Sequence, residues 1–300
     1  MVAQDMKAIH DSERTLVMGV LNITEDSFSD GGLWLDPAKA KAHGEAMMKD
    51  GADIIDIGAE STRPGAKRVS EEDEKSRVLG AVDALVPEGA ILSIDTTRAS
   101  VASAALEHGA QIINDVSGGR LDAELPHVVA DHPESLYIVQ HWRGWLAGAA
   151  GNVPDADTSV YANGVLNDVY DELMAQVDAV LSVGVKPEQV IIDPGLGFSK
   201  PGIEHNLPLL AGLERFNATG HPVLVGASRK RFIGAVLAAA VMSFPLMVRA
   251  IRLALEDRDN ATAAISALSA EHGAWAVRVH DVARTRDAIA IGSAWRTYSK

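Results

Sequence analysis

Short apolar runs recur along the whole chain, separated by longer stretches in which apolar residues return at helical spacing. The runs are rich in Val, Ile and Leu and are continuous rather than alternating, which is typical of parallel strands covered on both faces. Eight such runs predict eight strands, at residues 16–22, 53–60, 90–95, 111–115, 136–140, 190–192, 222–227 and 275–279.

The stretches between the runs carry helix start and stop signals. Asp36-Pro37 is typical of an N-cap followed by Pro at the first helical position, and Gly51 ends the helix that they predict. Ser70, followed by acids at 71–73, predicts a second helix start. Further helices are expected at 99–107, near 123–130, and at 160–183, 232–255, 260–272 and 282–298.

This alternation, without a linker or a break in composition, predicts an α/β fold made of a single (β/α)8 TIM barrel. We assign residues 1–15 to an N-terminal extension and residues 16–300 to the barrel domain. A doubly wound sheet is the alternative. It is disfavoured because no strand is followed by a GxGxxG fingerprint, and no GxxxxGK[ST] loop occurs either.

Composition narrows the functional class. An apolar fraction of 47% in 300 residues is ordinary for a globular protein with a sizeable core. A net charge of −14 argues against a generic nucleic-acid binder. The chain has no cysteine, which excludes disulfides, thiolate catalysis and Cys-ligated zinc. The N-terminal residues are polar without an apolar signal core, so we expect a cytoplasmic protein.

One apolar segment requires a membrane check. Residues 232–248 lie between Arg231 and Arg249, but they fall short of the ~20 residues that a spanning helix needs, and Pro245 interrupts them. We expect no membrane association and interpret the segment as a buried or subunit-contacting helix pair.

Polar side chains stand where the predicted strands end, and in a barrel all of these ends meet at one rim. Asp95, Asn114 and Asp193 offer hydrogen-bond acceptors and an amide donor, a set that suits a flat heterocycle with an amino-pyrimidinone edge. The full set of strand-end residues is Asn22, Glu60, Asp95, Asn114, His141, Asp193, Lys230, Arg278 and His280.

Lys230, Arg278 and His280 bring positive charge to the same rim, which suits a phosphate or pyrophosphate group. Asn22 and a bound Mg²⁺ are expected to share that anion, because magnesium takes few protein ligands together with phosphate oxygens. No Ser or Cys nucleophile accompanies His280, so a covalent enzyme intermediate is not expected.

Each of these residues also has a structural interpretation. Asp95 can cap the helix that starts near residue 99, and Asn114 can stabilise its own turn. His141 is interpreted as a structural rim residue, and Glu60 as a member of a buried network or of the pocket. Lys230 can belong to a solvated basic cluster, although positive charge at a helix start opposes the helix dipole and favours a bound anion.

Seven segments, in one order from residue 16 to residue 282, together resemble the dihydropteroate synthase family. They are MGVLNITEDSFSDGG (18–32), GADIIDIGAESTRPGA (51–66), SIDTTR (93–98), INDVSGG (113–119), IIDPGLGFSK (191–200), GASRKRF (226–232) and VRVHDV (277–282).

The resemblance implies a barrel that condenses 6-hydroxymethyl-7,8-dihydropterin pyrophosphate with p-aminobenzoate, giving 7,8-dihydropteroate and pyrophosphate with the help of Mg²⁺. It also implies a homodimer and competition by sulfonamides. Asp95, Asp193, Lys230 and Arg63 are the implied catalytic residues, and Asn22 is the implied metal ligand. The implied substrate-binding residues are Asn22, Thr62, Asp95, Asn114, Asp193, Phe198, Ser228, Lys230, Arg278 and His280, with Phe28, Pro64 and the 228–231 segment helping to shape the p-aminobenzoate site.

The chemistry is consistent with this resemblance. Cations ease the departure of pyrophosphate, and an electron-rich dihydropterin stabilises the cation left on its methylene carbon. Loops 23–32 and 61–65 are expected to close over the second substrate. Two departures stand out: Glu25 replaces a Pro found in many relatives, and residues 140–143 vary the usual Met-His segment.

Three alternatives remain at this point. The pterin domain of a corrinoid methyltransferase would not need the 23–32 and 61–65 loops or the 228–232 anion site. A non-catalytic pterin-binding paralogue is disfavoured because Arg63, Lys230, Arg278 and His280 are all present. A purely structural protein leaves the polar strand ends unexplained.

Overall fold

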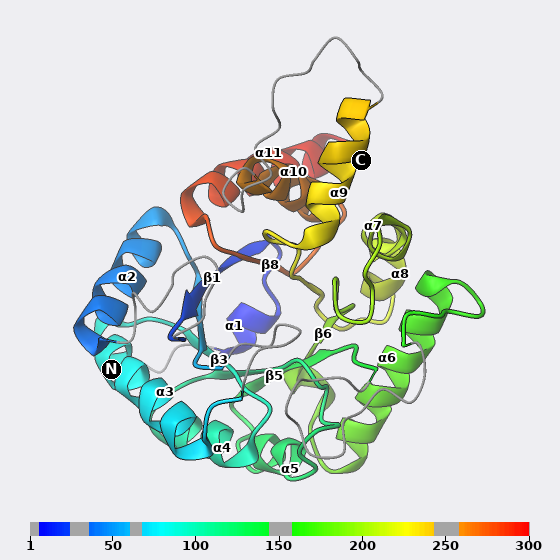
Figure 1. The fold of residues 1–300 in the computed structure, drawn as a ribbon. Coiled ribbons are helices and arrows are strands. Elements are labelled where there is room, and N and C mark those ends of the chain that lie inside the picture. Colours follow the sequence, from blue (N-terminus) through cyan, green and yellow to red (C-terminus); the bar gives the residue numbers. More distant parts are fainter. Residues whose placement is uncertain (1–5, 25–35, 61–67, 144–157, 243–257, 300) are drawn as a thin grey trace.

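Eight parallel strands form one sheet at the centre of the protein (Figure 1). The computed structural model describes residues 6–24, 36–60, 68–143, 158–242 and 258–299. Neighbouring strands follow the order β6-β5-β4-β3-β2-β1-β8-β7. The strands are β1 (Leu16–Asn22), β2 (Ile54–Gly58), β3 (Leu92–Asp95), β4 (Ile112–Asp115), β5 (Leu136–Gln140), β6 (Val190–Asp193), β7 (Leu224–Val225) and β8 (Ala276–Val279).

The sheet closes on itself between β6 and β7. Ile192 and Val223 form a parallel bridge, and the Ile192 amide donates to the Pro222 carbonyl over 2.9 Å. The predicted single (β/α)8 barrel is therefore confirmed, and the doubly wound alternative is wrong.

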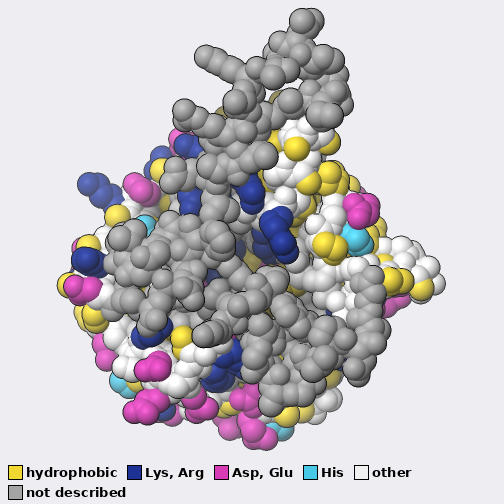
Figure 2. Space-filling model, in the orientation of Figure 1, with side chains coloured by type: hydrophobic (Ala, Val, Ile, Leu, Met, Phe, Trp, Pro, Cys, Tyr) yellow, Lys and Arg dark blue, Asp and Glu magenta, His cyan; other side chains and the backbone are white. Residues whose placement is uncertain are grey.

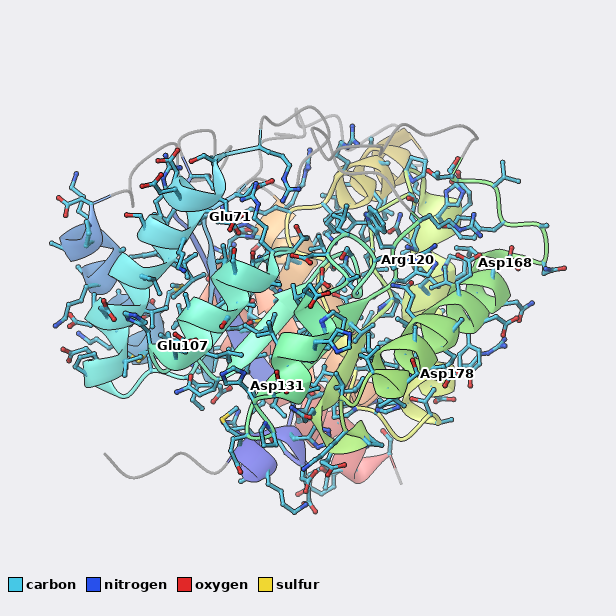
Figure 3. All side chains as sticks on the ribbon, turned by 90° about the horizontal axis from the view of Figure 1, so that it is seen from below. Glu71, Glu107, Arg120, Asp131, Asp168 and Asp178 are labelled. Atoms are coloured by element: carbon cyan, nitrogen blue, oxygen red, sulfur yellow. The ribbon has the colours of Figure 1, made fainter. Side chains whose placement is uncertain are left out.

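Helices surround the strands in a ring (Figure 1). In the side view, Glu71 and Asp168, near the starts of α3 and α6, lie toward one end of the barrel, while Glu107 and Asp178 lie toward the end where α1 is found (Figure 3). Helix starts and strand ends thus share one rim. The helices are α1 (Met6–His10), α2 (Pro37–Asp50), α3 (Glu71–Leu85), α4 (Ala99–Glu107), α5 (Leu125–Ala130), α6 (Val165–Ser182), α7 (Ile203–Ala211), α8 (Leu213–Asn217), α9 (Arg231–Met242), α10 (Asp259–Glu271) and α11 (Val282–Tyr298), with short 3-10 turns at Val86–Glu88 and Pro187–Gln189.

Local capping explains where the first long helices begin and end. The Asp36 side chain accepts a hydrogen bond of 2.9 Å from the Ala38 amide, and Pro37 opens α2 as predicted. Gly51 ends that helix at a φ of 103°, which an L side chain rarely adopts. Ser70 caps α3 by accepting from the Asp73 amide at 3.1 Å.

Two apolar layers make up the core. The outer layer lies between the strands and the helices and includes Val17, Ile57 and Val82. A separate cluster includes residues from several strands, among them Met18 and Ile54, which face each other in the register. Met6 and Ile9 of α1 pack against this second cluster. Apolar side chains therefore occupy one part of the barrel and leave the strand ends for polar groups.

Some elements differ from the sequence-based expectation. Helices α7 and α8 were not predicted, because both are short and Pro208 lies inside α7. Helix α6 begins at Val165 instead of residue 160, since Gly164 adopts a φ of 86° directly before it. Residues 6–10 of the predicted N-terminal extension form α1, whose Ile9 carbonyl accepts from the Trp275 indole at 2.8 Å. The division into extension and barrel domain stays a prediction.

The apolar segment after β7 forms α9 over its described part. Phe232 and Ile233 are buried, while Ala235, Ala239 and Ala240 are exposed as the helix leads away from the barrel (Figure 1). Among the residues that the structure describes, no helix is long and apolar enough to cross a membrane. Residues 243–257 lie outside the described residues, and a subunit contact at this segment stays a prediction.

Close packing of α10 against α11 gives a test of the fold. A Cβ added at Gly292 would lie 2.0 Å from the Ala267 carbonyl oxygen, so Gly292→Ala must separate the two helices. We expect a loss of about 1–3 kcal/mol in the free energy of unfolding, measured by urea denaturation.

The matched control for that variant is Gly80→Ala in α3. There the nearest atom, Pro37 Cγ, lies at an ordinary 3.7 Å, so Ala should raise stability by up to about 1 kcal/mol through helix propensity. Equal effects of the two substitutions would contradict the packing described for α10 and α11.

Candidate active site

Polar residues of neighbouring strands meet at the rim where the strands end. Asp95 and Asn114 face each other in the β3–β4 register, and Asp193 ends β6 beside Gln140 of β5. Asp95, Asn114 and Asp193 are 7%, 3% and 3% exposed. Burial of this kind is costly unless each group has a partner, so the partners define the site.

Asp56 of β2 is a partner that the sequence analysis missed. Its carboxylate is fully buried and accepts from Ser93 Oγ at 2.6 Å, from Arg278 Nε at 2.5 Å and from Asn114 Nδ2 at 3.3 Å. Arg278 also donates to Asp95 Oδ2 at 2.8 Å. Asp56 thus orients Asn114 and Arg278, two of the predicted substrate-binding residues. A carboxylate inside an otherwise apolar strand was the signal that could have revealed it.

Asp95 has one satisfied and one unsatisfied oxygen. Oδ2 accepts from Arg278, whereas Oδ1 is buried and has no hydrogen-bond partner within the described residues. Burial raises the pKa of Asp95 to about 7, although the positive charge of Arg278 opposes the shift. An acceptor without a donor, on a residue at the rim of a barrel, is a group that a ligand can satisfy.

Asp193 and Lys230 form a second part of the site. Asp193 Oδ1 accepts from the Gly195 amide at 2.7 Å. A Cβ at Gly226 would lie 3.6 Å from Asp193 Oδ2 and 3.9 Å from Lys230 Nζ, so both groups border that glycine. Burial raises the pKa of Asp193 and lowers that of Lys230 to about 8, while the charges of the two groups oppose both shifts.

Lys230 also connects the site to the loop after β6. Its ammonium donates to the Leu196 carbonyl and lies 4.9 Å from the centroid of the Phe198 ring, a cation–π distance. The predicted residues Lys230 and Phe198 are therefore brought together. A site that combines this ring with the carboxylates can contact both a flat ring and its polar edge.

Ser228 and His280 meet at the ends of β7 and β8. Ser228 Oγ lies 2.9 Å from His280 Nδ1 and accepts from the His280 amide at 3.3 Å. Arg229 turns away from the rim with a φ of 57°, and its guanidinium makes two hydrogen bonds of 2.8 Å to Asp259 of α10. The basic run after β7 is thus divided between the rim and a structural ion pair.

Arg278 is paired with two buried carboxylates, Asp56 and Asp95. Burial alone would lower its pKa, but Asp56 and Asp95 outweigh that cost and raise it. Arg278 therefore stays charged, and a quarter of its side chain remains exposed at the rim. Figure 2 shows Lys and Arg side chains on this face near the start of α9, with acidic side chains along its outer edge.

Asn22 and Glu60 lie on the β1–β2 side of the rim. A Cβ at Gly58 would lie 3.7 Å from Asn22 Oδ1 and 3.6 Å from Asp95 Cβ, which places Asn22 beside Asp95. Glu60 accepts from Arg68 at 2.5 Å and lies 3.0 Å from Arg98, so it belongs to a separate charged network.

The other predicted residues have different outcomes. Thr62 and Arg63, together with Phe28 and Pro64, lie outside the described residues. His141 is fully buried, in agreement with a structural role. The assignments of Asn22, Asp95, Asn114, Asp193, Phe198, Ser228, Lys230, Arg278 and His280 to substrate stay predictions, although all nine lie at or near the same rim.

Comparison with known proteins identifies the relatives of this site. The family model described as pterin binding enzyme matches residues 18–280. A dihydropteroate synthase of Mycobacterium leprae is 48% identical over 279 residues, 93% of either chain. The chain belongs to the dihydropteroate synthase family.

Solved structures of family members superpose on the barrel. The Burkholderia cenocepacia dihydropteroate synthase complexed with 7,8-dihydropteroate is 36% identical, with a TM-score of 0.79 over 96% of this chain and 94% of that one. The Yersinia pestis enzyme in a sulfonamide drug complex is 32% identical, with a TM-score of 0.81 over 95% of both chains. The resemblance stated from the seven sequence segments is confirmed.

The buried Asp95 gives a pH-dependent prediction for the ligand-free protein. Its folded pKa, about 7, lies above its ordinary value of 3.8, so between these values the folded state binds more protons than the unfolded state. The contribution of Asp95 to stability is then present at low pH and falls as the pH rises toward 7.

Asp95→Asn should remove the loss of stability that the Asp95 carboxyl causes as the pH rises. Relative to the wild type, its free energy of unfolding is expected to rise by on the order of 2–4 kcal/mol between about pH 5 and about pH 8, measured in urea. Asp178→Asn, at an exposed position of α6, is the control and should follow the wild type. Parallel curves for all three proteins would contradict the pKa given to Asp95.

Proposed function

We propose that this chain condenses 6-hydroxymethyl-7,8-dihydropterin pyrophosphate with p-aminobenzoate, giving 7,8-dihydropteroate and pyrophosphate. The observation that carries the proposal is the orphaned oxygen of Asp95, buried among acceptors at a rim that also holds Lys230 and Arg278. Family members of the same fold bear the dihydropteroate synthase name. The alternative of a non-catalytic pterin-binding paralogue has no such support.

The acceptors account for recognition of the pterin. An amino-pyrimidinone edge presents N–H donors in a row, and the carboxylates of Asp95 and Asp193 accept them while the Asn114 amide adds a donor and an acceptor. Lys230 lies beside Asp193 and donates to acceptors on the ring. Asp56 is not a ligand in this scheme, because its oxygens already bind Ser93, Asn114 and Arg278.

The cations account for the leaving group. The bond between the pterin methylene carbon and the pyrophosphate oxygen breaks, and its electron pair leaves with the pyrophosphate. Arg278 and His280 stabilise the departing charge, while Asp95 and Asp193 stabilise the positive charge spread over the pterin. The amine of p-aminobenzoate then attacks the methylene carbon and loses a proton, so no enzyme nucleophile is needed.

The second substrate is placed beside the first. Phe198 packs under Lys230, and the helix that begins at Arg231 presents backbone amides suited to the p-aminobenzoate carboxylate. Thr62 and Arg63 are assigned to the same substrate by family resemblance. Sulfonamides, which share the aniline ring, are expected to compete at this position, in line with the sulfonamide complex of the Yersinia relative.

Magnesium belongs to the proposal. Asn22 offers an amide oxygen beside Asp95, and one such oxygen together with phosphate oxygens and water is a donor set that Mg²⁺ commonly takes. No group of three or more His, Cys, Asp or Glu side chains that could hold a metal ion occurs in the part of the chain that the structure describes. Bound at Asn22, Mg²⁺ would neutralise charge on the pyrophosphate.

We place the reaction in the cytoplasm, without nucleic-acid or membrane partners.

Lys230→Ala tests the assignment of the site. The variant should lose about 100-fold or more in kcat/KM, because a half-buried charge that acts on the transition state is removed, while its unfolding curve remains cooperative. Lys39→Ala, at an exposed position of α2, is the control. Pyrophosphate release is measured with each substrate and Mg²⁺ omitted in turn.

The assays in which one substrate or Mg²⁺ is omitted distinguish a synthase from a non-catalytic pterin-binding paralogue. Release that requires both substrates and Mg²⁺ and yields dihydropteroate supports the synthase. Tight pterin binding without release would contradict it and favour the non-catalytic paralogue. Near-normal turnover of Lys230→Ala would overturn the role given to Lys230 while leaving the activity intact.

A homodimer is the expected assembly. Ile291, Trp295 and Tyr298 follow one face of α11 at helical spacing and are 68%, 68% and 92% exposed, and Leu268 of α10 is 61% exposed. Large exposed apolar side chains that gather on two adjacent helices suit a subunit contact.

Trp295→Lys should therefore shift the protein from dimer to monomer in sedimentation velocity. Leu207→Lys on α7 changes an exposed apolar residue on another helix and should leave the dimer intact. A monomeric wild type, or dimers of unchanged affinity in Trp295→Lys, would contradict the proposed interface.

A further inference from the structure

Lys200 is a charged side chain that the proposed reaction does not use. It follows the loop after β6 and is only 1% exposed. Its Nζ has three neighbours at hydrogen-bond distance: His141 Nδ1 at 2.9 Å, the Gly195 carbonyl at 3.0 Å and the Phe198 carbonyl at 2.9 Å. An ammonium has three N–H donors, so these neighbours satisfy it completely and none is left for a substrate.

Glu172 of α6 fixes where the protons of this cluster lie. Its carboxylate accepts two hydrogen bonds from Arg143, of 2.8 and 2.6 Å, and faces His141 Nε2 at 2.9 Å. Burial alone would raise the pKa of Glu172, but His141 and Arg143 lower it to about 2. Because the ionised carboxylate can only accept, His141 must carry a proton on Nε2.

The other His141 nitrogen then accepts from Lys200. Burial lowers the pKa of Lys200 well below its ordinary 10.5, but two of the three neighbours of Nζ are carbonyls that can only accept hydrogen bonds. With Nε2 of His141 already protonated, a further proton on Nδ1 would make the ring a buried cation, so the proton between Nδ1 and Nζ belongs to the more basic amine. Burial, followed by the charge of Lys200, lowers the pKa of His141 to about 3, in agreement with a neutral ring. The result is a chain of alternating donors and acceptors from Arg143 to the loop after β6.

This chain closes into a ring of contacts. The Arg143 guanidinium lies 3.8 Å from the centroid of the Tyr161 ring, and the Tyr161 hydroxyl donates to the Ser199 carbonyl at 3.1 Å. Ser199 directly precedes Lys200. We call the set Lys200, His141, Glu172, Arg143, Tyr161 and Ser199 the Lys200 ring; it connects the end of β5, helix α6 and the loop after β6.

The loop that the Lys200 ring holds has an unusual backbone. Gly195, Gly197 and Ser199 have φ angles of 69°, 78° and 53°, and for Ser199 such an angle costs on the order of 1 kcal/mol or more. Lys200 binds carbonyls near both ends of this loop. The buried ammonium therefore ties together a loop that contains one unfavourable backbone angle, at Ser199.

The same loop supplies three parts of the active site. The Gly195 amide orients Asp193, the Leu196 carbonyl accepts from Lys230, and Phe198 carries the ring beneath Lys230. We propose that Lys200 is a positioning residue for the condensation, holding residues 194–199 so that Asp193, Lys230 and Phe198 face the two substrates. The inference rests on the proposed function of this site.

Lys200→Met tests the inference by removing the ammonium while keeping most of the volume. We expect kcat/KM to fall about 100-fold, since a shift of about 1 Å in a positioned group has effects of this size. The dissociation constant of 6-hydroxymethylpterin, measured by calorimetry, should rise at least about tenfold because Asp193 is displaced. Tyr161→Phe removes only the bond to Ser199 and should show a smaller change in the same direction, while Lys39→Met should behave as the wild type.

The tautomer of His141 provides a test that needs no variant. Nitrogen-15 shifts of the wild-type ring should show a neutral imidazole protonated on Nε2 from about pH 5 to about pH 8. In Lys200→Met, the pKa of His141 should rise, because a cation that opposed its protonation is gone. A ring protonated on Nδ1 would overturn the scheme even if Lys200→Met did not fold.

The kinetics of Lys200→Met distinguish the positioning role from its alternatives. Lys200→Met with kinetics within about threefold of the wild type would overturn the positioning role. Loss of kcat with unchanged pterin affinity and a missing limb of the pH–rate profile would make Lys200 a proton-transfer group instead. An inactive wild type would contradict the proposed function, whereas the tautomer of His141 and the effect of Lys200→Met on pterin binding would still test whether Lys200 holds the loop.

Discussion

Charge buried at the ends of the strands is the constraint on which the rest of this protein depends. Asp56, Asp95 and Asp193 are removed from water at one rim, and Arg278 and Lys230 are placed among them. Burial raises the pKa of Asp95 and of Asp193, neighbouring carboxylates add to the shift of Asp95, and Arg278 remains charged. The site is complementary to a ligand that brings donors to the carboxylates and an anion to the cations.

The surrounding fold holds these charges where they lie. The apolar cluster that includes Met18 and Ile54 keeps the strands in register, and the same register sets Asp95 opposite Asn114. Two further networks lie at the rim. The Lys200 ring binds the loop after β6, and the Glu60–Arg68 pair joins the residues on either side of 61–67. A reaction through a stabilised cation needs charged groups held in fixed positions and needs no enzyme nucleophile. Networks of ion pairs hold the charged groups in this way.

Local signals made much of the fold predictable from the sequence. Asp36, Gly51 and Ser70 cap helices through bonds to residues within four positions, so their roles appear in the sequence itself. The eight strands were predictable because continuous apolar runs are buried on both faces. Helices α7 and α8 were not, because they are short and one contains Pro208.

The site was predictable as a set of residue types but not as a network. Strand-end acids and cations could be named, whereas Asp56 and Lys200 act through partners distant in the sequence. Arg278 is 222 positions from Asp56, and His141 is 59 from Lys200. Tertiary packing determines which of several acidic side chains pairs with a given cationic side chain. The family resemblance supplied Thr62 and Arg63, which lie outside the described residues.

The most direct test of the central claim is the affinity of the protein for 6-hydroxymethylpterin, which lacks pyrophosphate and cannot react. Calorimetry at about pH 8 compares the wild type with Asp95→Asn and with the exposed-site control Asp178→Asn. If the buried oxygen of Asp95 exists to accept a pterin donor, Asp95→Asn should bind about 100-fold more weakly, a difference of about 3 kcal/mol, while the control is unchanged. Equal affinities for all three proteins would contradict the account of the strand-end carboxylates given above.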